Sequence, residues 1–176
     1  MEPVEISAPG LLLRPWRATD APEVMLALRE AAIAQWNPLP GVVDLEAARA
    51  WVRRRADWSS LEHVSLAIAN PTTDALLGSL SLHQICGENA AIGYWTVEQA
   101  RGRGVASRAV TAMTDWAFQF LRLHRIELCH AVANAASCRV AEKAGYRFEG
   151  VLRESHRYGD GQRHDEHIHG RLATDA

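Results

Sequence analysis

Apolar and polar side chains alternate along several short stretches of the chain, and this alternation is typical of half-buried β-strands. Two such stretches, Val64 to Ala69 and Leu76 to Ile85, are separated by the turn residues Asn-Pro-Thr-Thr-Asp, which predicts a hairpin. In a third stretch Gly93 indicates a β-bulge. Strands are predicted over residues 11–16, 64–69, 76–85, 90–97, 125–132, 146–152 and 162–172.

Elsewhere apolar residues recur at spacings of three and four, the period of an amphipathic helix. Helices are predicted to start after the capping residues Thr19-Asp20 and Asp44. Between them, two prolines and a glycine in residues 35–41 predict a rigid loop, in which Trp36 either packs on the core or faces a substrate. The predicted helices cover residues 21–30, 44–58, 104–120 and 134–144, the last ended by Gly145 in a left-handed conformation.

Length and composition narrow the class of protein. The 176 residues, of which 48% are hydrophobic and 23% charged, predict one globular domain over residues 1–176. A net charge of -2 argues against nucleic acid or an anionic membrane as a partner. Three widely spaced cysteines favour a reducing compartment, and no signal peptide or membrane span is visible, so a cytoplasmic location is predicted.

The stretch from Gln99 to Ala106, Gln-Ala-Arg-Gly-Arg-Gly-Val-Ala, joins a predicted strand to the longest predicted helix. Gly102 and Gly104 allow a tight turn that brings the main chain close to a ligand. Free N–H groups of the loop and of the first helical turn, with the positive end of the helix dipole behind them, attract anions. The sequence therefore predicts a phosphate or pyrophosphate site here.

Spacing excludes two common phosphate loops. No Gly-Lys pair follows, as a P-loop requires, and Ser107 stands where a dinucleotide fingerprint has its third glycine. The pattern Q/R-x-x-G-x-G/A instead resembles the acyl-coenzyme A pyrophosphate loop of the GNAT superfamily of N-acetyltransferases.

A second motif extends this resemblance. Residues 134–153, Asn-Ala-Ala-Ser-Cys-Arg-Val-Ala-Glu-Lys-Ala-Gly-Tyr-Arg-Phe-Glu-Gly-Val-Leu-Arg, are similar to the C-terminal signature of the GNAT subgroup related to ribosomal-protein N-terminal acetyltransferases. The similarity covers about residues 10 to 172. It implies an α/β (α+β) fold with a mixed, mostly antiparallel twisted sheet, flanked by helices, in which one parallel pair of strands splays apart.

The resemblance also implies roles for individual residues. Acetyl-CoA is the implied donor; its pantetheine arm lies between the splayed strands, and Asn134 contacts it. Ser137 stands near the sulfur and protonates the leaving thiolate. Capping of the helix explains both residues equally well without any catalytic role. The remaining implied cofactor contacts are main-chain groups of Trp95, Thr96 and Val97 at the thioester, and of Arg101, Gly102, Arg103, Gly104, Val105 and Ala106 at the pyrophosphate.

The general base is left open by the sequence. Relatives often carry a glutamate two residues before the strand glycine, where this chain has Ala91. Glu88, Glu98 and His83 are alternative catalytic candidates, as is a chain of water molecules.

The predicted reaction is direct acetyl transfer to a primary amine, with the N-terminal α-amine of a protein or peptide as the preferred acceptor. Small amines such as polyamines or antibiotics, and a module that binds acyl-coenzyme A without turnover, are the alternatives. A homodimer is also predicted.

A metal site is not predicted. Histidines 164, 167 and 169 lie on one predicted strand, but the strand period places only His167 and His169 on one face, and no cysteine is near them in the sequence.

Overall fold

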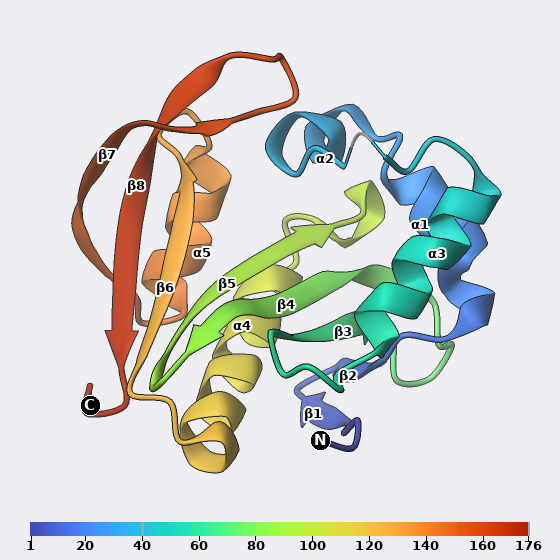
Figure 1. Ribbon diagram of the computed structural model, residues 1–176, viewed down its shortest axis with the longest axis horizontal. Coiled ribbons are helices and arrows are strands. Elements are labelled where there is room, and N and C mark those ends of the chain that lie inside the picture. The colour runs from blue at the N-terminus through green and yellow to red at the C-terminus, as the bar shows by residue number, and fades with distance from the viewer. Residues whose placement is uncertain (40, 176) are drawn as a thin grey trace.

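One mixed sheet organises the molecule, as the computed structural model in Figure 1 shows for residues 1–39 and 41–175, which it describes. Within these residues eight strands lie in the spatial order β1-β2-β3-β4-β5-β6-β8-β7. Neighbouring strands are antiparallel, except that β5 and β6 pair in parallel. The strands are Ile6–Ala8 (β1), Leu11–Pro15 (β2), His63–Ala69 (β3), Leu76–Cys86 (β4), Asn89–Thr96 (β5), Arg125–Ala131 (β6), Arg147–Arg157 (β7) and Arg163–Leu172 (β8).

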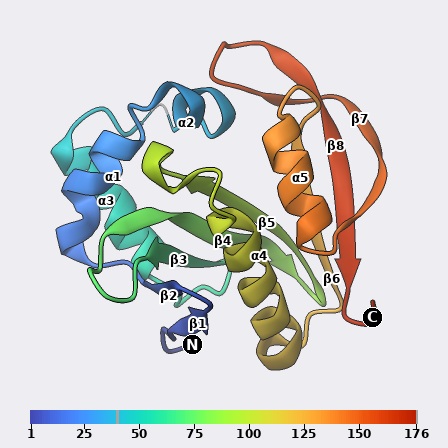
Figure 2. The same ribbon diagram turned by 180° about the vertical axis from the view of Figure 1, so that it is seen from behind.

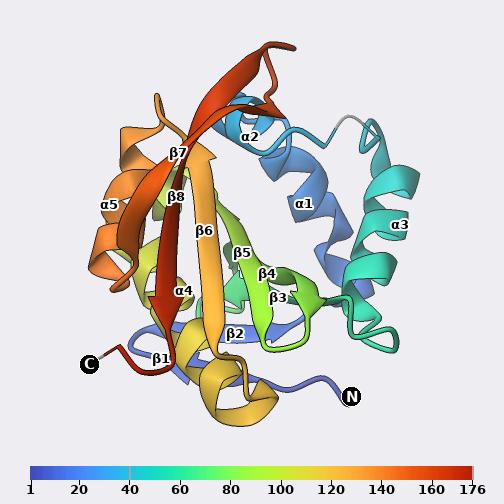
Figure 3. The ribbon, with the colours of Figure 1, turned by 60° about the vertical axis from the view of Figure 1, so that its left-hand side comes forward.

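Helices cover both faces of this sheet. Helices α1 and α3 lie on one side, and α4 and α5 lie on the other, where Figure 2 shows them in front of the strands (Figures 2 and 3). The helices are Ala21–Ala27 (α1), Ala31–Trp36 (α2), Leu45–Ala56 (α3), Val105–Trp116 (α4) and Ala135–Lys143 (α5), with 3-10 turns at Ala18–Asp20 (η1) and Glu98–Ala100 (η2) and a π-helical turn at Ala117–Leu121 (η3). None of the helices described combines the length and apolar composition of a membrane span.

Burial follows the predicted periodicity in helix α4 but not the predicted alternation in strands β3 and β7. Strand β3 is buried almost throughout because helices cover both of its faces. The long helix α4 buries one stripe against the sheet. Completely buried side chains at the centre of the core include those of Leu13, Leu66, Leu80, Val110 and Met113.

The parallel pair separates shortly after it forms. Ladder pairing between β5 and β6 is confined to Asn89–Ala91 opposite Arg125–Glu127. Beyond Ala91 the two strands diverge, and Figure 1 shows the resulting V between them. Since β5 still pairs with β4 along its length, only its edge toward β6 loses its partner. The predicted splayed parallel pair is therefore confirmed.

Several predictions about local structure are wrong. Gly93 is not a bulge, because it pairs in register with Ser81 of β4, and the divergence arises on the β6 side instead. Gln35 and Trp36 belong to α2 rather than to a loop, since the helix precedes the first proline. Strand β1 was not predicted.

Of the two predicted helix caps, the one at Asp44 is confirmed and the one at Asp20 is wrong. The Asp44 carboxylate accepts a hydrogen bond from the main-chain N–H of Ala47 at 2.8 Å, as predicted for the start of α3. Asp20 stands at the N-cap of α1 but does not cap it. Its two carboxylate oxygens instead accept hydrogen bonds of 2.8 and 2.9 Å from the buried guanidinium of Arg14. A buried cation requires such a partner, and this requirement outweighs capping.

Candidate active site

A cleft opens where β5 and β6 diverge, and we refer to it as the splay cleft. It has a volume of about 370 Å³, within the usual range of small-molecule sites. Its walls are main chain and side chains of β5 on one side and of β6 and α5 on the other, and the start of α4 and helix α2 also line it. The cleft therefore combines an unpaired strand edge with a helix N-terminus.

The loop before α4 has the conformation that its glycines predict. Gly102 and Gly104 have φ angles of 73° and 69°, in the left-handed region that favours glycine. Gly104 is the N-cap residue of α4, and no side chain caps this helix. The first-turn N–H groups of Val105 and Ala106, both of which line the splay cleft, have no partner within the helix. An anion at this end of the cleft would supply these missing acceptors.

Arg101 does not project freely into the loop. Its Nε donates to the carbonyl oxygen of Thr96 at 3.1 Å, and its Nη2 forms an ion pair with Glu30. The guanidinium thus ties the loop to the segment before α2. Positive charge along the cleft is also supplied by Arg139 and Lys143 of α5, which line it as well.

Two hydroxyl groups meet across the splay cleft. The phenol of Tyr94, on β5, lies 2.8 Å from the Ser137 hydroxyl on α5. The side-chain oxygen of Asn134 accepts the main-chain N–H of Ser137 at 3.2 Å and caps α5. Capping thus uses the side chain of Asn134 and only the main chain of Ser137, so the Ser137 hydroxyl remains available for chemistry.

The environment of this pair keeps both hydroxyls protonated. Burial raises the pKa of Tyr94 to about 12, and the hydrogen bond with Ser137 opposes the shift only in part. The phenol therefore holds its proton throughout the neutral range. The Tyr94–Ser137 pair thus places two protonated hydroxyl groups in the part of the cleft where the strands have separated.

Aromatic side chains form the end of the cleft near α2. Trp36 lies edge-on to Tyr158, with 5.6 Å between ring centroids, and both line the cleft. The Tyr158 hydroxyl donates to Glu166 at 2.7 Å, and burial and this carboxylate raise the pKa of Tyr158 well above its usual value. Both interpretations of Trp36 are therefore compatible with the structure, because its ring contacts Tyr158 and also faces the cleft.

None of the three side chains considered as general bases is among the described residues that line the cleft. Glu88 is in the β4–β5 turn, where its carbonyl accepts the N–H of His124 at 2.7 Å, at the closed end of the V. Glu98 begins η2. His83 lies on β4 opposite Ala91, and burial, together with the charge of Arg55, lowers its pKa. The described cleft lining contains no aspartate or glutamate.

Most of the predicted cofactor contacts do come together. Two of the predicted contacts, Val97 and Arg103, are not among the described residues that line the cleft. The predicted contacts that line it are Trp95, Thr96, Arg101, Gly102, Gly104, Val105, Ala106, Asn134 and Ser137.

Sequence reasoning missed Tyr94, Tyr158 and His130. All three line the cleft. Tyr94 lies within a strand, Tyr158 at a turn and His130 near a strand end, and at these places the hydrophobic pattern of the sequence indicates only packing. Tyr94 could have been suspected from alternation, since it is two residues from Ile92 on the strand that leads into the anion loop.

The histidine prediction needs one correction. His167 and His169 do share a face of β8, while His164 pairs with Asp160 at 2.8 Å. However, a cysteine does lie near them, because Cys138 of α5 and His130 of β6 join the same cluster in space.

Known proteins share this sequence pattern and fold. A family model described as an acetyltransferase (GNAT) domain matches residues 10–147. The probable N-acetyltransferase YjcK of Bacillus subtilis is 38% identical over 97 residues, which are 53% of this chain and 54% of that protein. The ribosomal-protein-serine acetyltransferase of Escherichia coli is 33% identical over 84 residues, 47% of each chain. The matches thus span about half the length of these two relatives.

A solved structure matches over nearly the whole chain. RimL, described as a ribosomal L7/L12 α-N-protein acetyltransferase in complex with coenzyme A, is 25% identical with a TM-score of 0.84. The match covers 96% of this chain and 98% of that one. The fold, including the splayed parallel pair, is therefore that of a known group of acetyltransferases.

Proposed function

Because the chain belongs to the GNAT acetyltransferase family, we propose that it transfers the acetyl group of acetyl-CoA to the N-terminal α-amine of a protein or peptide. The observation that carries the proposal is the splay cleft itself. It leads from the uncapped start of α4, past an unpaired strand edge, to the Tyr94–Ser137 hydroxyl pair.

The donor is proposed to occupy the cleft along its length. The pyrophosphate binds the main-chain N–H groups between Gly102 and Ala106, where the helix dipole favours negative charge. The pantetheine arm lies along the free edge of β5 and replaces part of the missing strand pairing. Coenzyme A in the RimL structure and the family membership support acetyl-CoA as the donor.

The proposed chemistry needs no covalent enzyme intermediate. The lone pair of the amine attacks the thioester carbonyl carbon, the carbon–sulfur bond breaks, and the thiolate leaves with that electron pair. Ser137 gives its hydroxyl proton to the thiolate and regains one from Tyr94, 2.8 Å away. Main-chain groups of β5 near Trp95 polarise the carbonyl. The amine releases its proton to water, and water returns a proton to Tyr94, so that both hydroxyls are restored for the next turnover.

The missing acidic base favours an α-amine. Only the neutral amine attacks, and at pH 7 an α-amine with a pKa of about 7.7 is neutral in roughly one molecule in six. A lysine amine with a pKa of about 10.4 is neutral in roughly one in 2,500, which adds about 3.5 kcal/mol for deprotonation. Since no carboxylate is found among the described lining residues, the cleft suits the acceptor that needs less help. The names of the ribosomal-protein acetyltransferase relatives support the same substrate class.

Matched peptides test the proposal. One peptide has a free N-terminus and no lysine, and the other is N-terminally blocked and contains one lysine. At neutral pH we expect acetylation of the first to be faster, with free thiol released in equal amount. Faster acetylation of the blocked lysine peptide, or activity confined to a polyamine or an antibiotic, would contradict the proposed acceptor. Binding of acetyl-CoA without thiol release under any amine would identify a non-catalytic module.

We also propose a homodimer, on the basis of the family resemblance. Sedimentation of the purified chain at several concentrations tests this.

A further inference from the structure

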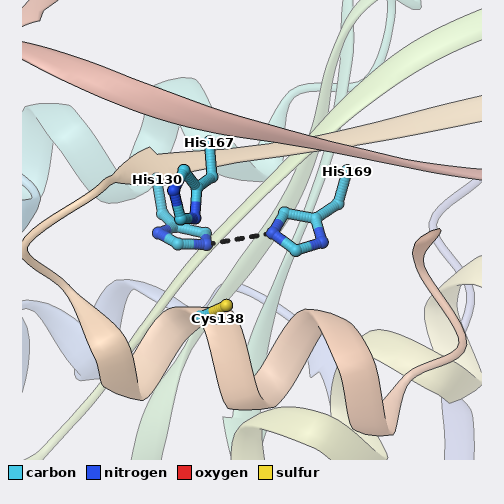
Figure 4. Close-up of side chains that lie close together, drawn as sticks. All are labelled: His130, Cys138, His167 and His169. Atoms are coloured by element: carbon cyan, nitrogen blue, oxygen red, sulfur yellow. Dashed lines mark hydrogen bonds between the residues drawn. The ribbon is translucent and has the colours of Figure 1, made fainter. Parts of the chain in front are cut away.

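A compact group of nitrogen and sulfur ligands lies between α5 and the sheet, beside the splay cleft. His130 comes from β6, His167 and His169 from β8, and Cys138 from α5. Figure 4 shows the three rings pointing toward one another above the helix that carries the thiol. One potential ligand atom from each residue lies within 4.8 Å of those of the other three.

We infer that these four residues form a zinc site. Zinc takes four ligands in a tetrahedron, and cysteine and histidine are its commonest protein ligands. The inference goes beyond the proposed transferase function and does not depend on it.

The spacing of the two innermost nitrogens matches such a site. With zinc–nitrogen bonds of about 2.0–2.1 Å, two nitrogens of a tetrahedron lie about 3.3–3.4 Å apart. The Nε2 atoms of His130 and His169 are 3.3 Å apart. Nitrogen–sulfur edges of a tetrahedral site are about 3.5 Å, so the widest pairs in the cluster need to close by about 1 Å, which side-chain rotation can provide.

The tautomer of His130 points its free lone pair inward. Nδ1 of His130 lies 2.9 Å from the carbonyl oxygen of Ala131, and because a carbonyl can only accept, Nδ1 carries the hydrogen. Nε2 is then a lone-pair donor facing His169, as a metal ligand must be. The bond to the Ala131 carbonyl is also the kind of outer contact that orients metal-binding histidines.

A further nitrogen in the cluster has no hydrogen-bond partner among the described residues. Nδ1 of His167 is buried without a partner among the described residues, beside His169, which is 1% exposed. Buried polar atoms are nearly always paired, and an unpaired one often indicates an ion or water.

The position of the site gives the ion a structural role. Zinc would link α5 to β6 and β8, which approach from different parts of the chain. Ser137 and Asn134 lie in the same helical segment as Cys138 and line the cleft. The ion would thus fix the wall of the cleft that carries the proton donor.

Zinc titration of the whole chain tests the inference. The purified protein is stripped with a chelator, titrated with zinc alone, and assayed for bound metal and for its melting temperature. We expect one zinc per chain and a melting temperature that rises with zinc concentration, since an ion that binds only the folded state stabilises it. With cobalt in place of zinc, we expect the thiolate-to-metal charge-transfer absorption of a cysteine ligand.

Variants distinguish a specific zinc site from adventitious zinc binding. Cys138→Ser and His169→Asn remove one ligand each and should weaken zinc binding by about tenfold or more, since even the loss of an outer contact costs that much. Cys86→Ser and His164→Asn change the same residue types outside the cluster and should bind zinc like the unaltered chain. If His169→Asn fails to fold, Cys138→Ser carries the test alone, because Cys138 is only partly buried.

The inference is overturned if the unaltered chain binds no zinc, or if Cys138→Ser binds it as tightly and shows the same cobalt spectrum. Metal content is measured without acetyl-CoA or amine, so failure of the zinc site and failure of the proposed transferase function are separate outcomes.

Discussion

At the scale of single residues, the hydroxyl pair of Tyr94 and Ser137 joins the two walls of the splay cleft. The two residues are far apart in the sequence, and they meet only because β5 and α5 face each other across the gap. Asn134 provides the cap of α5 through its own side chain. The hydroxyl of Ser137 and the capping of the helix are therefore separable by mutation.

Replacing Ser137 by alanine tests the proton donor. We expect Ser137→Ala to lower kcat by about 10²-fold or more, with little change in acetyl-CoA affinity, because the hydroxyl acts only as the thiolate departs. Stability should change little, since the main-chain N–H that Asn134 caps is retained. Steady-state kinetics, calorimetry and a melting curve on one preparation give the three values.

Tyr94→Phe is the matched variant, because it removes only the second hydroxyl of the pair. It should lower kcat by less than Ser137→Ala does. Normal turnover of Ser137→Ala would exclude the proposed proton donor.

The lowered pKa of His83 predicts that the stability of the fold depends on pH. Burial and the charge of Arg55 lower the pKa of His83 in the folded chain, and the unfolded value is about 6.5. Between these two values the unfolded state binds more protons, so the free energy of unfolding falls as the pH falls below about 6.5. Above that pH His83 is neutral in both states and no longer lowers the free energy of unfolding.

We therefore expect His83→Gln to flatten this dependence. Urea denaturation at about pH 8 and about pH 5.5 should show a smaller loss of stability in the variant than in the unaltered chain. His164→Gln, in the accessible β7–β8 turn region, is the control. An equal loss in His83→Gln and the unaltered chain would contradict the assignment.

At the scale of elements, the loop before α4 and the free edge of β5 form a continuous binding surface. Gly102 and Gly104 place the main chain in the left-handed region, and α4 begins immediately afterwards. A Cβ atom at Gly104 would also lie 3.1 Å from Nη1 of Arg108, which in turn donates to the carbonyl of Arg103 at 2.8 Å. A side chain at this position would distort the loop that presents the N–H groups.

Gly104→Val should accordingly weaken acetyl-CoA binding by about tenfold or more, because β-branching disfavours a positive φ and the loop must shift. Calorimetric titration measures the affinity. Gly10→Val is a close control, since Gly10 has a φ of 70° and open space around its Cβ position, but lies in the β1–β2 turn. It should share the backbone strain and leave the affinity unchanged. Unchanged affinity in a folded Gly104→Val variant would argue against the anion loop.

At the scale of the whole molecule, the tip of the β7–β8 hairpin reaches across to α2 (Figure 1), and residues of both segments line the cleft. The N–H of Gly159 donates to the carbonyl of Gln35 at 2.9 Å. A Cβ atom at Gly159 would lie 2.1 Å from the carbonyl oxygen of Ala34, so this contact requires glycine. Trp36 and Tyr158 meet beside it.

We expect Gly159→Ala to separate the hairpin tip from α2 and to raise the KM for the amine about tenfold, with acetyl-CoA affinity unchanged, since Gly159 contacts Ala34 and Gln35 and not the anion loop. Two-substrate kinetics distinguish the two effects. Gly150→Ala, on the same hairpin with nothing near its Cβ position, should have no such effect. An unchanged KM for the amine would place the acceptor elsewhere.

The sequence by itself determined those features that depend on neighbours along the chain. The left-handed glycines of the anion loop, the cap at Asp44 and the order of most strands and helices follow from contacts a few residues apart. Local steric preference and hydrophobic period dictate such features whatever the rest of the fold does. The resemblance of two sequence motifs to those of GNAT proteins also predicted the splayed pair of strands.

Only the tertiary structure decided what meets across the sheet. The partner of Ser137, the pairing of His83 with Ala91 and the approach of Cys138 to three histidines all depend on strand order and register. Strand β8 inserts between β6 and β7, and this order brings His167 and His169 beside His130. A single sequence does not encode such pairings in any local pattern, because they arise from the packing of segments that are distant along the chain.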